Sequence, residues 1–148
     1  MYPLGHFSIA LATRDSSRNI FRLLFCCFLT ILPDFDFLLG FEHRTFTHSI
    51  VFSFIVGLII SRKKWLYYSF LILSHSLLDM LCYDHPRNGV QLFWPFSSNY
   101  YQFPFHPFYA TPMNLSMGIE FIFLFNLLII RETFDKTKKF ILNGKCPI

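Results

Sequence analysis

Four apolar runs dominate the sequence and set the strongest limit on its fold. They cover residues 20–32, 46–60, 65–81 and 117–130 and are 13 to 17 residues long. As helices, runs of this length rise roughly 20–25 Å. They are shorter than the ~20 residues of an ordinary membrane span, and such lengths also suit buried helices of a soluble protein. The 148 residues form one domain, 1–148, and we expect an all-α fold of one of these two kinds.

The placement of Lys and Arg decides between the two. If the runs alternate across a membrane, with Ile20 entering from the cytoplasm, 11 of the 13 basic residues face the cytoplasm. Only Arg44 and Arg87 fall outside, as the positive-inside rule requires. We therefore expect an integral membrane bundle of about four transmembrane helices, with a short N-terminal helix over 4–12 and a long aromatic loop over 82–116. This placement also explains the net charge of +4 without a nucleic-acid partner.

Three polar clusters stand out in a chain of which only 15% is charged. They are LPDFD at 32–36, HRTFTHS at 43–49 and HSLLD at 75–79. The topology deduced from charge places all three at the non-cytoplasmic face, where Glu120 also opens the last run. Ionisable groups at membrane depth are costly and are usually functional or paired. Because imidazole and carboxylate are zinc ligands, the clusters predict a metal site at this face.

The candidate ligands of a divalent metal, zinc foremost, are His6, Asp34, His48, His75, Asp79 and Glu120. His75 and Asp79 are spaced i, i+4 and project from one helix face. The candidate catalytic residues are His43, Arg44 and Asp36. Arg44 would clamp a phosphate or other oxyanion, His43 would protonate a leaving group, and Asp36 or Glu120 would accept a proton from metal-bound water.

Single residues also have simpler explanations. Asp34 is typical of a helix end or turn, Arg44 could pair with Glu42, and Glu120 could stabilise a helix N-terminus. His85 and His106 lie in the aromatic loop without a partner at helical spacing, so we expect them at the membrane interface.

The stretches HRTFTHSI, LPDFD and HSLLD, together with GVQLFWPF at 89–96, resemble a bacterial family of inner-membrane, predicted metal-dependent hydrolases. The resemblance runs from Gly5 to about Glu120. It implies an inner-membrane hydrolase whose site is lined by His6, Asp34, His43, His48, His75, Asp79 and Glu120, and it is weaker at Asp36. A more distant similarity is to zinc-dependent phospholipase C enzymes. This chain has Ser116 where they have a histidine, which removes one ligand of their three-metal site.

These features favour a membrane-bound metal-dependent hydrolase that acts at the non-cytoplasmic face on a lipid, phosphoester or other small molecule. The main alternative is a non-enzymatic metal-binding or transport protein. Transport is disfavoured because the cytoplasmic half of the runs offers no ionisable residue except Arg22. A third class, a membrane adaptor that uses the aromatic loop, leaves the histidine–aspartate clusters unexplained.

Overall fold

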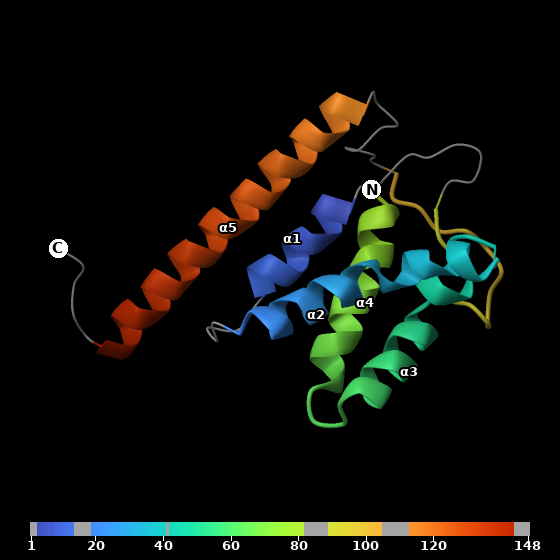
Figure 1. Cartoon of the computed structure of the whole chain (residues 1–148), viewed down its shortest axis with the longest axis horizontal. Helices are drawn as coiled ribbons and strands as arrows, with labels where there is room; N and C mark the ends of the chain where they lie inside the picture. The colour runs from blue at the N-terminus through green and yellow to red at the C-terminus, as the bar shows by residue number, and fades with distance from the viewer. Residues whose placement is uncertain (1–2, 14–18, 41, 82–88, 105–112, 144–148) are drawn as a thin grey trace.

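The computed structural model describes residues 3–13, 19–40, 42–81, 89–104 and 113–143. Within these residues the chain is helical and forms no strand beyond one isolated β-bridge between Val90 and Tyr101 (Figure 1). The α-helices are α1 (Pro3–Thr13), α2 (Ile20–Ile31), α3 (Ile50–Ile60), α4 (Trp65–Asp79) and α5 (Met113–Asn143), with 3₁₀ segments η1 (Leu32–Leu39) and η2 (Phe46–His48). The all-α prediction is confirmed. The predicted interfacial histidines, His85 and His106, lie outside the described residues.

The helix ends follow local chemistry. The side chain of Asn19 accepts a hydrogen bond from Arg22 N and caps α2 where the sequence predicts its start. The α-helix ends at Ile31 because Pro33 has no N–H and its ring disfavours a continuing α-helix, and the chain passes into η1. This 3₁₀ segment carries two aspartates, Asp34 and Asp36.

The start of α3 corrects one expectation. The apolar run begins at residue 46, but residues 46–48 form the 3₁₀ turn η2 and the α-helix starts at Ile50. Ser49 is the N-cap, and its Oγ accepts from Phe52 N at 3.1 Å. The hydroxyl of Thr47 instead donates to Asp36 Oδ2 at 3.0 Å.

Helix α3 packs on α4 as a close hairpin, and Gly57 makes that approach possible. A Cβ added at Gly57 would lie 2.1 Å from Ser69 Oγ and 2.7 Å from Trp65 O. On the other side of α4, helices α1 and α2 complete a small core with it, formed by Ala10, Cys26, Leu29, Leu71 and Ile72.

Helix α5 extends well beyond the apolar run at 117–130, in both directions (Figure 1). Its C-terminal part is supported by the i, i+4 pairs Arg131–Asp135 and Lys136–Glu132. The helix lies along α1, and Arg131 Nη1 donates to Leu11 O at 3.1 Å. The first and last helices of the chain are therefore neighbours.

No helix in the described part of the chain is both long enough and apolar enough to cross a bilayer. The predicted bundle of four transmembrane helices is therefore not confirmed. Large apolar side chains are nevertheless exposed on several helices, among them Phe21, Ile59, Leu66 and Phe134.

Candidate metal centre

Four segments bring the predicted ligands together at one end of α4. Helix α1 supplies His6, η1 supplies Asp34 and Asp36, the 42–49 segment supplies His43, Arg44 and His48, and the last turns of α4 supply His75 and Asp79. His6, His48, His75 and Asp79 are at most 2% exposed, whereas the side chains of Asp34 and His43 are 40% and 43% exposed. The cluster is thus buried on the helix side and open at Asp34 and His43.

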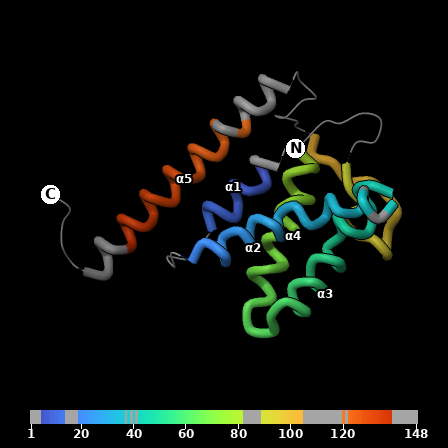
Figure 2. Tube along the Cα trace, viewed as in Figure 1, coloured from blue at the N-terminus to red at the C-terminus, as the bar shows by residue number. Residues whose placement is uncertain are grey.

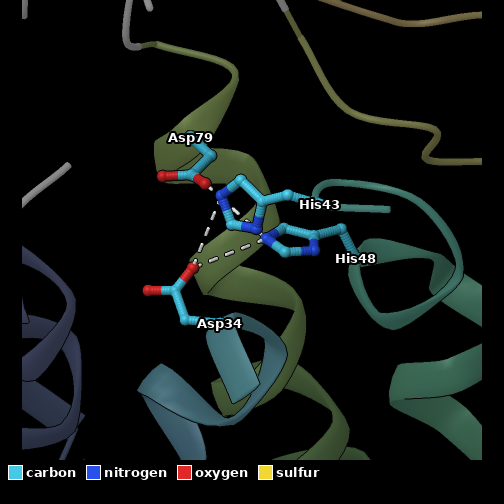
Figure 3. A group of neighbouring side chains, drawn as sticks. All are labelled: Asp34, His43, His48 and Asp79. Carbon is cyan, nitrogen blue, oxygen red and sulfur yellow. Dashed lines mark ion pairs between the residues drawn. The ribbon is translucent and has the colours of Figure 1, made fainter. Parts of the chain in front are cut away.

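The ligand atoms form two groups that share Asp34. In the first, Asp34, His43, His48 and Asp79 each offer a ligand atom, and all four atoms lie within 4.8 Å of one another. Figure 3 shows these side chains pointing toward a common centre. In the second, His6, Asp34 and His75 meet in the same way. Asp34 therefore belongs to both groups that could hold a metal ion, and its Oδ1 lies 3.2 Å from His75 Nε2 and 3.9 Å from His48 Nε2.

The tautomers of the histidines follow from the partners of their Nδ1 atoms. His75 Nδ1 lies 2.7 Å from the carbonyl of Thr30, which can only accept, so Nδ1 carries the proton. That carbonyl is one of the last four of α2, which have no intrahelical donor. His43 Nδ1 likewise donates to Asp36 Oδ1 at 3.0 Å. In the neutral rings the lone pair is then on Nε2, the atom that faces the aspartates.

Asp36 fixes the positions of the residues on the exposed side of the centre. It is fully buried, and its carboxylate accepts from Thr47 Oγ1, from Arg44 N at 3.3 Å and from His43 Nδ1. Thr47 Oγ1 also lies 3.0 Å from His48 Nδ1. Because the Thr47 proton is given to Asp36, the Thr47 oxygen accepts from His48 Nδ1, and Nε2 of His48 is left with its lone pair. A carboxylate behind a ligand histidine is the usual means of fixing its ring.

The surroundings of the histidines in the centre shift their pKa values. Burial lowers the pKa of His6 to about 4, so its ring is neutral near pH 7. The hydrogen bond that His43 Nδ1 donates to Asp36 raises the pKa of His43 above its ordinary value, against a smaller opposing effect of burial.

Two buried nitrogens make the strongest argument for a cation. Nε2 of His48 and Nε2 of His75 have no hydrogen-bond partner within the described residues. Both face Asp79 Oδ2, at 3.7 and 3.6 Å. A lone pair aimed at a carboxylate oxygen is repulsive unless a positive charge lies between them. Bound metal satisfies both atoms, and the donor set of imidazoles and carboxylates fits zinc and similar divalent ions.

Arg44 lies at the edge of this centre in an unusual backbone conformation. Its φ is +66°, a left-handed value uncommon for a residue with a Cβ, and its side chain is buried. Arg44 Nε lies 3.5 Å from Asp79 Oδ2, and its carbonyl accepts from Gln91 N at 2.9 Å. The guanidinium is thus directed to the cluster by backbone contacts on both sides.

Glu120 reaches the neighbourhood of the centre but is not among the two groups of ligand atoms. It is 2% exposed, and its Oε2 accepts from Gly5 N at 2.9 Å. It therefore holds the first turn of α1, which carries His6. The sequence interpretation overlooked Thr47 and the Thr30 carbonyl. The position of Thr47 beside His48 was the one available signal, and nothing marked Thr30.

The geometry defines an all-helical protein with a candidate metal centre of imidazoles and carboxylates. Among known families, that of the YdjM inner membrane protein matches residues 3–139, and the chain belongs to this family of inner membrane proteins. Inner membrane protein YbcI of Escherichia coli (strain K12) is 37% identical over 116 residues. That alignment covers 64% of this chain and 66% of YbcI, slightly less than two thirds of its length. No solved structure matches the chain.

Proposed function

We propose that this protein is a metal-dependent hydrolase of the bacterial inner membrane, acting on a phosphoester or ester at the non-cytoplasmic face. The observation that carries the proposal is the pair of buried imidazole lone pairs, on His48 and His75, that face carboxylate oxygen without a proton between them. Membership in an inner membrane family supports the location.

The residues divide into holders of the metal and groups that act around it. His48, His75, Asp79, Asp34 and His6 would hold one or two divalent cations, and His43, a member of the first ligand group, would join them through Nε2 when its ring is neutral. Such a cation supplies a Lewis acid and lowers the pKa of bound water toward ~7. Asp34, shared by both ligand groups and 40% exposed, stands where an approaching substrate would meet the centre.

Arg44 and His43 would handle the charge and proton of the substrate. The Arg44 guanidinium beside Asp79 would bind an oxyanion through its planar fork. His43 is exposed on one side and fixed by Asp36 on the other, so it would move a proton between the site and water. In this proposal Asp36 orients His43 and His48. The sequence prediction that Asp36 is itself a general base remains a prediction.

Metal content tests the proposal directly. The protein would be purified in detergent, stripped with a chelator, reloaded with zinc or manganese and analysed by elemental mass spectrometry. Asp79→Asn should lose most of the bound metal, because one oxygen that serves the cluster is replaced by an amide nitrogen. Asp135→Asn is the matched control, since Asp135 is an exposed carboxylate on α5. Equal metal content in both variants would refute the site.

The sidedness has its own test. A single cysteine at Asn99, an exposed residue of the 89–104 loop, would be introduced into a chain without its four native cysteines. An impermeant thiol reagent should label it in intact cells from the outside, whereas a cysteine at Lys63 should be labelled only after lysis. The opposite labelling pattern would show that residues 89–104 face the cytoplasm and would refute the proposed sidedness.

A further inference from the structure

Residues 89–104 form a loop beside the 42–49 segment, which supplies His43, Arg44 and His48, although the sequence predicts no regular structure there (Figure 2). Val90 and Tyr101 exchange two backbone hydrogen bonds, at 2.9 and 2.8 Å. Trp94 N donates to Gln91 O, and Phe96 N donates to Phe93 O at 2.9 Å. The Phe93 ring packs edge-on against Tyr101 with ring centres 5.0 Å apart. The loop therefore keeps its shape through its own contacts.

Four aromatic side chains of this loop are exposed, and the loop carries no charged residue. Phe93, Trp94, Phe96 and Phe103 are 45%, 40%, 86% and 39% exposed, and we call these four side chains the aromatic platform. Residues 89–104 contain no Asp, Glu, Lys or Arg. Exposed apolar surface of this kind marks an interaction site, and tryptophan is enriched where a protein crosses the headgroup region of a bilayer.

The aromatic platform is coupled to the metal centre through backbone contacts. Gln91 N donates to Arg44 O at 2.9 Å, and Ile50 N donates to Leu92 O at 3.0 Å. The Trp94 ring lies 5.8 Å from that of Phe46, the residue that starts η2 and leads to His48. Whatever holds the platform therefore also fixes the depth at which Arg44 and His48 lie.

We propose that the aromatic platform inserts into the headgroup region of the lipid bilayer and holds the metal centre at that depth. The bilayer is favoured because the platform lacks charges for a specific protein partner, because large apolar residues are also exposed on the helices, and because the family is one of inner membrane proteins. This inference rests on the proposed function and specifies the class of its substrate. It is an amphiphile whose ester or phosphoester group lies at headgroup depth.

Tryptophan fluorescence tests the insertion without reference to catalysis. The chain has two tryptophans, so Trp65→Phe leaves Trp94 as the single reporter. The variant would be reconstituted at high dilution into nanodiscs of phospholipid brominated either near the acyl carbonyl or near the terminal methyl. Trp94 should be quenched more strongly by the shallow bromines, and adding Phe96→Asp should reduce that quenching. Trp94 in a parent-like fold but quenched by neither lipid would overturn the proposal.

The same samples separate the two proposals. Quenching of Trp94 by shallow bromines is expected in His75→Ala as well, where metal is lost, because His75 lies on α4 and is not part of the platform. Normal metal content without quenching would refute the platform alone, whereas quenching without metal in the parent would refute the proposed function alone. Trp94 that is unquenched at high protein density and becomes quenched only on dilution of the protein in lipid would show that a second copy covers the platform, and would also overturn the proposal.

Discussion

Replacement of Asp36 by Asn is the sharpest probe of how the centre is built. The carboxylate has two oxygens with separate tasks. Oδ2 accepts from Thr47 Oγ1 and Arg44 N, while Oδ1 accepts from His43 Nδ1. An asparagine can keep its oxygen in the first position, but its NH₂ group then faces His43 Nδ1. That nitrogen has to give up its proton, which moves to Nε2 and removes the lone pair directed toward Asp34.

The expected loss follows from this rearrangement. Removing a carboxylate behind a ligand histidine typically costs ~10–100-fold in metal affinity, or ~1.4–2.7 kcal/mol. Stability without metal should fall by only about 1 kcal/mol, because one hydrogen bond to a half-exposed ring is lost. The assay is competition for zinc between the detergent-purified protein and a chromophoric chelator, with thermal unfolding of the stripped protein in parallel. Asp135→Asn is again the matched control.

Parent affinity in Asp36→Asn would refute the orienting role. If the affinity stayed the same and hydrolysis of an identified substrate fell, Asp36 would be the general base that the sequence suggested. Lower affinity together with a collapse of thermal stability would indicate instead that Asp36 mainly holds the 42–49 segment in place.

Three further predictions test other parts of the structure. Gly57→Ala should destabilise the protein by about 1–3 kcal/mol in thermal unfolding, because the new Cβ would meet Ser69 Oγ. Parent stability would contradict the close packing of α3 on α4. Ser49→Ala should cost about 1 kcal/mol by removing the cap of α3, with metal content unchanged, and a loss of metal would show that the cap also shapes the site. Arg44→Lys should keep the metal and lose about 10²–10³ in hydrolysis rate once a substrate is known, and full activity would leave Arg44 without a role in turnover.

The sequence was most informative where chemistry and spacing coincided. The i, i+4 pair His75 and Asp79 needed only helix geometry to be placed on one face, and their Nε2 and Oδ2 atoms are 3.6 Å apart. Helix starts at Ile20 and Trp65 followed from the edges of apolar runs. Charge bias gathered the clusters at one face, and the structure brings Asp34, His43, His48 and Asp79 together.

The features that the sequence did not predict have local structural causes. The apolar run at 46–60 continues through η2 because Phe46 is apolar in either conformation, so hydropathy could not reveal that Ser49 caps the helix. The left-handed backbone of Arg44 depends on contacts with Asp36 and Gln91 that are distant in sequence. The order in the 89–104 loop arises from pairing between its two ends, which has no helical period to detect.

The hydrogen bond between Gly5 and Glu120 joins residues 115 positions apart and has a consequence for biogenesis. Helix α1 is translated first. The Glu120 carboxylate, which holds the first turn of α1 and therefore His6, is translated after every other member of the cluster. A nascent chain that has emerged only as far as α4 already carries Asp34, His48, His75 and Asp79 but lacks the support for His6. One ligand group can therefore assemble during synthesis, while the other waits for α5. In the proposed function, complete loading of the centre would then be a late event, and a ribosome stalled before residue 120 would leave His6 without the contact that holds its helix turn.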